Sequence, residues 1–292
     1  MTGILPIDKP TSITSHTVTS NIKRLTGEKC GHSGTLDPMA TGVLPVLVGS
    51  ATRLADFLAT DKQYIAHIQL GTLTDTGDIT GNVIENADFS HITKDDLLNA
   101  IKTFKGQIQQ TPPLYSAIKV NGQKLCDIAR KGLSADIPSR IITIYKIELL
   151  DYDASKGIFS LLVDCSKGTY IRTLAQDIGQ KLSTVATLSA LQRTVSCNIG
   201  IDKCISLDKA KTLSADDLGK YLITPEEYFS YLPKIILKEN AVKYYSNGGA
   251  IALNRTIFEA DCDLYCCYNP DGIFLGLCKN SEGSVKAIWS QK

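Results

Sequence analysis

The residues best suited to chemistry lie in one glycine- and proline-rich stretch of the chain. Residues 31–46 read GHSGTLDPMATGVLPV, and their three glycines and two prolines predict tightly turned backbone. Apart from His32, Asp37 is the only acidic or basic residue between positions 31 and 51. An isolated carboxylate of this kind can serve as a nucleophile or a base. A structural alternative stays open, because an aspartate followed by Pro38 also suits the N-cap of a helix.

A second stretch places an aromatic ring and a guanidinium two residues apart. Residues 165–173 read CSKGTYIRT and follow an alternating apolar run, 158–165, that predicts a strand. If Tyr170 and Arg172 also lie in a strand, their side chains point to the same side and can face one pocket. Tyr64 opens another alternating run, where a tyrosine would ordinarily be packed in the core.

The amino-acid composition is typical of an ordinary globular protein and does not indicate a binding partner. The 292 residues carry a net charge of only +1, so a nucleic-acid surface would have to come from a local cluster of Lys and Arg. One stretch, at 119–131, contains four basic residues and only one acidic residue, Asp127. The basic residues are Lys119, Lys124, Arg130 and Lys131. This cluster is either an ordinary solvated face or a track for RNA phosphates.

The cysteines and acids suggest neither disulfides nor a metal. Nine scattered cysteines, an odd number, and an N-terminus without a signal-peptide pattern predict reduced thiols in a cytoplasmic protein. No apolar run approaches the ~20 residues of a membrane span. The one cysteine cluster, at 262–278, contains no C-x-x-C pair. Asp75 and Asp78 lie among threonines and a glycine, as turn residues do, so we predict no metal site.

Periodicity predicts helices and strands around these stretches. Thr14 or Ser15 is expected to cap a helix that carries three apolar residues on one face, namely Val18, Ile22 and Leu25. A second helix opens at 93–96 and turns three apolar residues inward, namely Leu97, Ile101 and Phe104. The other elements expected before residue 190 are a short helix at 51–59, strands at 64–70, 141–150 and 158–165, and a helix after residue 173.

The last 60 or so residues differ from the rest of the chain in their pattern of predicted elements. Tyr231-Leu232-Pro233 reads as a linker, and a helix at 239–245 ends at Asn247-Gly248-Gly249, a good C-cap. Short strands follow near 250–255, 264–268, 273–278 and 284–289. A helix followed by short strands indicates a small barrel. We therefore predict two domains, at 1–229 and 230–292.

The stretch at 31–46 resembles the signature of the pseudouridine synthase B family, the bacterial tRNA pseudouridine-55 synthases. Further matches run in family order from about residue 4 to residue 194, and they include DKP at 8–10, the segment from Lys62 through the TDTGD run at 74–78, PPLYSAIK at 112–119, CSKGTYIRT at 165–173 and LSALQRT at 188–194. The resemblance implies an α+β fold with a mixed, mainly antiparallel central sheet flanked by helices. The C-terminal segment is similar in position and pattern to a PUA-type RNA-binding domain.

The resemblance also implies a reaction, the isomerisation of uridine to pseudouridine at position 55 in the T-loop of tRNA. The uracil is detached from its sugar, rotated and rejoined through carbon, which requires no cofactor or metal. A stacked base cannot be reached by a protein side chain, so the nucleotide must flip into a pocket.

The family motifs assign expected roles to individual residues. Asp37 is the catalytic aspartate, which attacks either the sugar or the base, and Arg172 is its expected charge partner. A close arginine would lower the pKa of Asp37, whereas burial would raise it. Tyr64 is expected to stack on the flipped base and, as a further hypothesis, to move a proton on the sugar. The remaining expected substrate contacts are His32 beside the flipped nucleotide and Tyr170 and Leu191 as pocket walls.

Three departures from the family pattern, at Ser12, Cys126 and Gln192, leave single packing or RNA contacts open. Two alternative functions also remain: a tRNA-binding or chaperone protein, and the related guide-RNA-dependent synthase of archaea and eukaryotes. The chain carries no basic extension and begins almost directly at the first motif. We therefore expect a monomeric enzyme that binds the T-arm of tRNA and works without a guide RNA.

Overall fold

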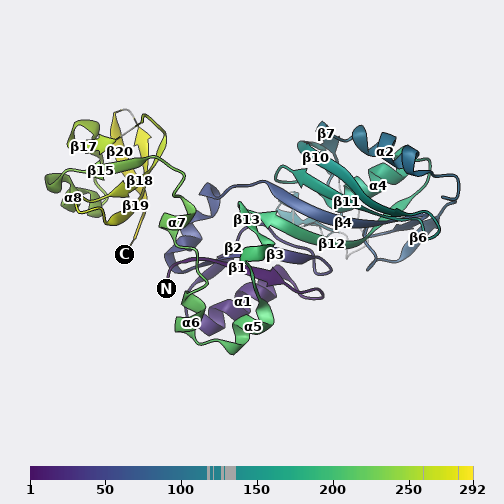
Figure 1. The fold of residues 1–292 in the computed structure, drawn as a ribbon, viewed down its shortest axis with the longest axis horizontal. Helices are drawn as coiled ribbons and strands as arrows, with labels where there is room; N and C mark the ends of the chain where they lie inside the picture. Colours follow the sequence, from purple (N-terminus) through teal and green to yellow (C-terminus); the bar gives the residue numbers. More distant parts are fainter. Residues whose placement is uncertain are drawn as a thin grey trace.

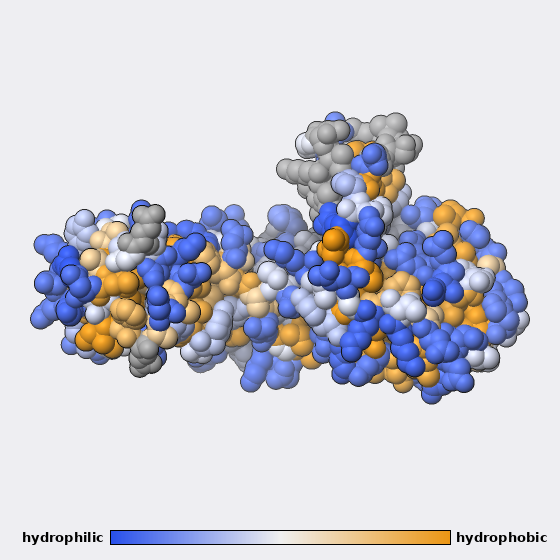
Figure 2. Space-filling view, turned by 90° about the horizontal axis from the view of Figure 1, so that it is seen from above, coloured by the Kyte–Doolittle hydropathy of each residue, from blue (hydrophilic) through white to orange (hydrophobic). Residues whose placement is uncertain are grey.

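The computed structural model describes residues 1–116, 119–120, 122–125, 128, 136–258, 260–281 and 283–291, with only the backbone described at 119, 120 and 124. Two β-sheets lie along an elongated molecule, the larger one from the middle to one end and the smaller, C-terminal one at the other end (Figure 1). Figure 2 shows polar and apolar residues interspersed over one face of this molecule. Within the described ranges, no helix is long and apolar enough to cross a membrane.

The central sheet joins ten strands of the described chain. Its order is β14-β1-β3-β12-β4-β11-β10-β7, with β2 beside β3 and β13 beside β12. Only the pairs β1–β14 and β3–β12 are parallel, so the expected mixed, mainly antiparallel sheet is confirmed. The strands are β1 (Gly3–Lys9), β2 (Cys30–His32), β3 (Thr41–Val48), β4 (Lys62–Leu70), β7 (Gly106–Gln110), β10 (Arg140–Asp153), β11 (Ile158–Cys165), β12 (Ala186–Ser196), β13 (Ile199–Gly200) and β14 (Ile205–Ser206).

Helices and two small hairpins flank this sheet. The helices before the C-terminal segment are α1 (Ser15–Thr26), α2 (Lys94–Lys102), α4 (Ile171–Lys181), α5 (Leu207–Thr212), α6 (Ala215–Gly219) and α7 (Pro225–Tyr228), with 3-10 turns η1 (Gly49–Phe57) and η2 (Ile201–Lys203). The hairpins pair β5 (Thr72–Thr74) with β6 (Val83–Asn86) and β8 (Lys119–Val120) with β9 (Gln123–Lys124).

The predicted helix caps are present. The Thr14 hydroxyl accepts a hydrogen bond from the amide of Thr17 at the start of α1, which turns Val18 and Ile22 into the core. Thr93 and Asp96 form a reciprocal capping box at the start of α2. Both helices therefore begin where local sequence predicts.

Strand β12 joins the two halves of the central sheet. It runs parallel to β3, with Arg193 opposite Gly42, and antiparallel to β4, with the same arginine opposite Tyr64. Separate apolar cores lie on the two sides, one around β1, β3 and α1 and the other around β4, β11 and α4. A pocket wall built from both halves therefore depends on β12.

The C-terminal segment folds into a second, barrel-like sheet of the order β16-β20-β19-β18-β15-β17. Its elements are β15 (Lys234–Leu237), α8 (Glu239–Ser246), β16 (Ile251–Ala252), η3 (Leu253–Arg255), β17 (Thr256–Phe258), β18 (Leu264–Tyr268), β19 (Phe274–Ser281) and β20 (Ser284–Ser290). One apolar cluster connects this sheet to the central one and includes Trp289, Val43 and Leu54. The indole of Trp289 also donates a hydrogen bond of 3.0 Å to the carbonyl of Ser50.

Candidate active site

A pocket of about 740 Å³ opens where the two halves of the central sheet meet. Five of the predicted site residues line it, namely Asp37, Tyr64, Tyr170, Arg172 and Leu191. They come from a loop, two strands and one helix that are far apart in the sequence. The fold therefore brings together both stretches that the sequence singles out.

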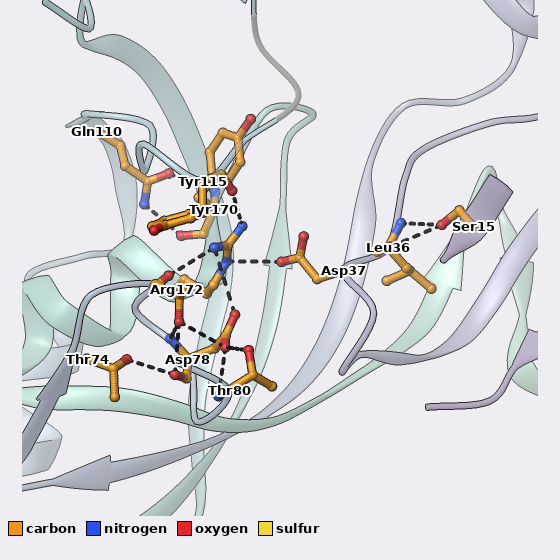
Figure 3. A network of polar contacts seen from close by, with 11 residues as sticks. Ser15, Leu36, Asp37, Thr74, Asp78, Thr80, Gln110, Tyr115, Tyr170 and Arg172 are labelled. Carbon is orange, nitrogen blue, oxygen red and sulfur yellow. Dashed lines mark hydrogen bonds and ion pairs between the residues drawn. The ribbon is translucent and has the colours of Figure 1, made fainter. Parts of the chain in front are cut away.

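Asp37 lies in an irregular loop between β2 and β3, and the alternative in which it caps a helix is wrong. The amide of Ala40 donates to the carbonyl of Asp37 at 3.1 Å, which closes a turn at Pro38-Met39, and β3 starts immediately afterwards at Thr41. The chain therefore has no room for a helix after the proline. The side chain of Asp37 is left free to enter the pocket (Figure 3).

Contacts from β1 and α1 hold this loop in place. The fully buried ammonium of Lys9 donates to three carbonyls, those of Pro10 and Ile13 at 2.8 Å and that of Pro38 at 3.2 Å. Burial lowers the pKa of Lys9 to about 8. The hydroxyl of Ser15 also bonds to both backbone groups of Leu36, the residue before Asp37.

Arg172 points at Asp37 from the opposite half of the sheet (Figure 3). Its Nε lies 3.0 Å from Oδ2 of Asp37, and because the N–H is not aligned on the oxygen, the contact is an ion pair rather than a good hydrogen bond. Its two terminal nitrogens donate to the carbonyls of Thr76 and Tyr115, each at 2.9 Å. The guanidinium is thus fixed by three segments.

Tyr170 and Arg172 do not share a strand, so the condition under which their side chains would point to the same side is not met. Strand β11 ends at Cys165, and after a short turn Tyr170 becomes the N-cap of α4, with Arg172 in the first helical turn. The apolar residues of α4, such as Leu174 and Ile178, are buried against the sheet, and this packing favours a helix. Both side chains still reach the pocket, by a different route.

Asp78 is a part of the site that sequence reasoning missed. It lies in a turn, as predicted, but it is 5% exposed and its Oδ2 is 3.8 Å from Nη1 of Arg172. Its other carboxylate oxygen accepts hydrogen bonds from Thr76 and from the amide and hydroxyl of Thr80. The guanidinium therefore lies between two carboxylates. The sequence feature that could have indicated this role is the pair of threonines around the acid, Thr76 and Thr80, because their hydroxyls can hydrogen-bond to a buried carboxylate.

The pKa of Asp37 reflects opposing influences. Burial raises it above the ordinary value of 3.8, the charge of Arg172 lowers it, and the nearby carboxylate of Asp78 raises it again. The net direction is upward. Although a third of the side chain can be reached by solvent, it sits in a recess with protein on most sides, so it is poorly hydrated.

Tyr64, Leu191 and Tyr170 form apolar walls around this charged pair. The phenol of Tyr64 is buried, and this burial raises its pKa to about 12, so the group is neutral near pH 7. Leu191 is 8% exposed and faces the pocket from β12. Aromatic rings and an aliphatic side chain that line one recess suit a flat, apolar-faced ligand such as a base.

The remaining predicted residues are not among the described residues that line the pocket. His32 ends β2 and is not among the residues that line the pocket, and burial lowers its pKa. Lys119 and Lys124 face each other in the β8–β9 hairpin, but only their backbone is described. Arg130, Lys131 and Cys126 lie outside the described residues. Within the described part of the chain, no group of three or more His, Cys, Asp or Glu is placed to hold a metal.

Known proteins are similar to this chain over most of its length. Residues 23–171 match the family described as TruB family pseudouridylate synthase (N terminal domain). The chain is 40% identical to the tRNA pseudouridine synthase B of Clostridium perfringens (strain 13 / Type A) over 291 residues, which cover 98% of this chain and 97% of that protein. It is also 40% identical to the tRNA pseudouridine synthase B of Synechocystis sp. over 255 residues, 87% of this chain and 86% of that protein.

A solved structure gives the same result for the fold. A chain in the crystal structure of a Cbf5-Nop10-Gar1 complex matches with a TM-score of 0.70 and 28% identity, covering 99% of this chain and 83% of that chain. Fold and pocket together thus define a pseudouridine synthase architecture. The chain belongs to the TruB family of pseudouridylate synthases, which confirms the resemblance inferred from its motifs.

Proposed function

We propose that this chain isomerises uridine 55 in the T-loop of tRNA to pseudouridine. The observation that carries the proposal is the ion pair of Asp37 and Arg172 in a pocket walled by Tyr64, Tyr170 and Leu191. A carboxylate held by a guanidinium supplies a nucleophile, and the walls supply a surface for a flipped base. The tRNA pseudouridine synthase B relatives support the same reaction and substrate.

The proposed reaction moves one bond and one proton. Asp37, in its carboxylate form, attacks the sugar or the base, and the bond between the uracil N1 and the ribose C1′ breaks. The uracil turns within the pocket, a bond forms between its C5 and C1′, the bond to Asp37 breaks and restores the carboxylate, and the proton on C5 is replaced by one at N1. Atoms and charge balance without a co-reactant, since the product is an isomer of the substrate.

Each wall of the pocket has a proposed part in this sequence. Tyr64 is proposed to stack on the base, and its neutral hydroxyl is proposed to take part in a proton transfer on the sugar. Tyr170 and Leu191 confine the base while it turns, and Arg172 keeps Asp37 ionised. His32 is proposed to support the extruded nucleotide from outside the pocket.

We further propose that the enzyme acts alone, as a cytoplasmic monomer without a guide RNA. The full-length relatives named tRNA pseudouridine synthase B support this over the guide-dependent alternative, although the structural neighbour comes from a multi-protein complex. The proposed domain boundary lies between residues 229 and 230, and the C-terminal, PUA-like domain and the basic cluster at 119–131 are proposed to bind the RNA backbone.

The decisive test is pseudouridine formation on an unmodified transcript of a tRNA T-arm with purified protein and no additive. We expect turnover by the wild type and none by Asp37→Ala, with RNA affinity largely retained by the variant. Tight binding without turnover by the wild type would favour a chaperone or a missing guide. Turnover by both proteins would show that the wrong aspartate has been chosen.

A further inference from the structure

Two buried polar side chains lie next to the Asp37–Arg172 pair and take no part in the proposed chemistry. The first is Ser15, which is 1% exposed at the start of α1. Its hydroxyl accepts a hydrogen bond of 2.8 Å from the amide of Leu36 and donates one of 3.1 Å to the carbonyl of the same residue. Both backbone groups of the residue before Asp37 are therefore held by one side chain.

The second is Gln110, the last residue of β7, which is 2% exposed. Its amide nitrogen donates to the carbonyl of Tyr170 at 3.1 Å, and its amide oxygen accepts from the backbone nitrogen of Tyr170 at 2.8 Å. Tyr170 is the N-cap of α4 and has no capping hydrogen bond from its own side chain. The glutamine thus holds the start of the helix that carries Arg172.

These two contacts have the same form on opposite sides of the ion pair (Figure 3). In each, one buried side chain bonds both the N–H and the C=O of a single loop residue, as the next strand of a sheet would. Leu36 and Tyr170 both lie in segments that are outside the strand ladders, so their positions are not fixed by the sheet itself. One clamp fixes the carboxylate, and the other fixes the guanidinium.

We propose that Ser15 and Gln110 are positioning residues that set the separation and orientation of Asp37 and Arg172 for the reaction. The inference rests on the function proposed above, because a precise carboxylate–guanidinium geometry matters only if Asp37 reacts. The pair comes from opposite halves of a large sheet, and a misplacement of about 1 Å at a reacting group can cost ~10²-fold in rate. Clamps on both sides prevent such a shift.

The test compares Ser15→Ala and Gln110→Met with a matched control, Thr184→Val. Thr184 is also buried and also bonds a distant carbonyl, that of Asp88 at 2.9 Å, but it does not line the pocket. The substrate is the unmodified T-arm transcript, and single-turnover rate, RNA affinity and melting temperature are measured for each protein. We expect each clamp variant to lose about 10- to 100-fold in rate with near wild-type RNA affinity, and the control to keep its rate.

A pH profile separates positioning from simple stabilisation of the fold. The charges that face Asp37 are Arg172 on α4, Asp78 in the turn before β6 and Lys9 on β1. If Arg172 moves away, the carboxyl of Asp37 loses its main positive neighbour and becomes protonated at higher pH. The acidic limb of the rate profile is therefore expected at higher pH in both clamp variants and at the wild-type position in Thr184→Val.

The outcomes distinguish this inference from the proposed function. A wild type that makes no pseudouridine contradicts the function, whatever the variants do. The positioning role is contradicted if the wild type makes pseudouridine while the clamp variants keep the wild-type position of the acidic limb and lose no more rate than the control does. If Gln110→Met does not fold, the small change Ser15→Ala still decides the question.

Discussion

At the scale of single residues, the site is a balance of three charges. Asp37 must be ionised to react, yet burial and Asp78 both raise its pKa, and Arg172 opposes them. A carboxylate with a raised pKa becomes protonated at a higher pH than an ordinary one does. As the pH falls, the proposed activity should therefore decline at a pH above 3.8, the ordinary pKa of an aspartate. Removing the charge of Arg172 and removing that of Asp78 should shift the acidic limb of the pH–rate profile in opposite directions.

Replacing Arg172 should damage both the rate and its pH dependence. In Arg172→Met, the positive charge that lowers the pKa of Asp37 is lost, so the acidic limb moves to higher pH. The rate should fall by about 10²-fold or more, as it does when an enzyme loses a preorganised charge or donor at a reacting group. Single-turnover rates across pH measure both effects, and an unshifted limb would contradict the role of the ion pair.

Neutralising the second carboxylate should shift the limb the other way. In Asp78→Asn, one of the influences that raise the pKa of Asp37 disappears, so the acidic limb moves to lower pH. The rate should nevertheless fall, since the guanidinium of Arg172 loses the charge 3.8 Å from its Nη1. The same pH series is the measurement. A shift in the direction of Arg172→Met would show that Asp78 acts through something other than its charge.

The two proposed roles of Tyr64 are separable by substitution. Tyr64→Phe keeps the ring that stacks on the base and removes only the hydroxyl, so RNA affinity should stay near the wild-type value while turnover falls. Tyr64→Leu should lower both. Binding and single-turnover assays on the T-arm transcript distinguish these results. Wild-type turnover in Tyr64→Phe would remove the hydroxyl from the mechanism.

At the scale of elements, the Asp37 loop depends on one close approach of backbone. Gly42 has a φ of +100°, and a Cβ at this position would clash with the carbonyl oxygen of Arg193 in β12. Gly42→Ala should lower the free energy of unfolding by about 2–4 kcal/mol through backbone strain and the forced separation of β3 from β12.

A second glycine provides the control for this effect. Gly27, at the C-cap of α1, has a similar positive φ of +69°, but a Cβ there would meet nothing within 4 Å. Gly27→Ala should therefore show the strain alone, about 1 kcal/mol. Urea unfolding of both variants gives the comparison, and equal losses would mean that the contact between β3 and β12 can relax.

Local signals predicted individual elements well and the connections between them poorly. The caps of α1 and α2 and the alternation of β11 were readable because each involves residues a few positions apart. The start of α4 was not, since Tyr170 caps it without a side-chain hydrogen bond and the partner of its backbone, Gln110, is 60 residues away. The role of Asp78 was missed for the same reason. Its partner Arg172 is distant in sequence and its surroundings look like an ordinary turn.

At the scale of the whole molecule, the two sheets share an apolar junction. The chain contains one tryptophan, Trp289, which is 1% exposed in this junction. Its fluorescence therefore reports whether the C-terminal sheet is docked. We expect the fluorescence transition in urea to coincide with that of far-UV circular dichroism. A fluorescence change at lower urea concentration would show that the C-terminal sheet detaches before the rest unfolds.

The central position of β12 also determines when the molecule becomes functional during its synthesis. Strands β3 and β4 are made early, but they are joined only through β12, whose last residue is Ser196. A ribosome-bound chain shorter than this holds Asp37 and Tyr64 with nothing to bring them together. The nascent protein therefore completes its pocket only after about two-thirds of translation, and we expect a chain that ends before β12 to be inert rather than partly active.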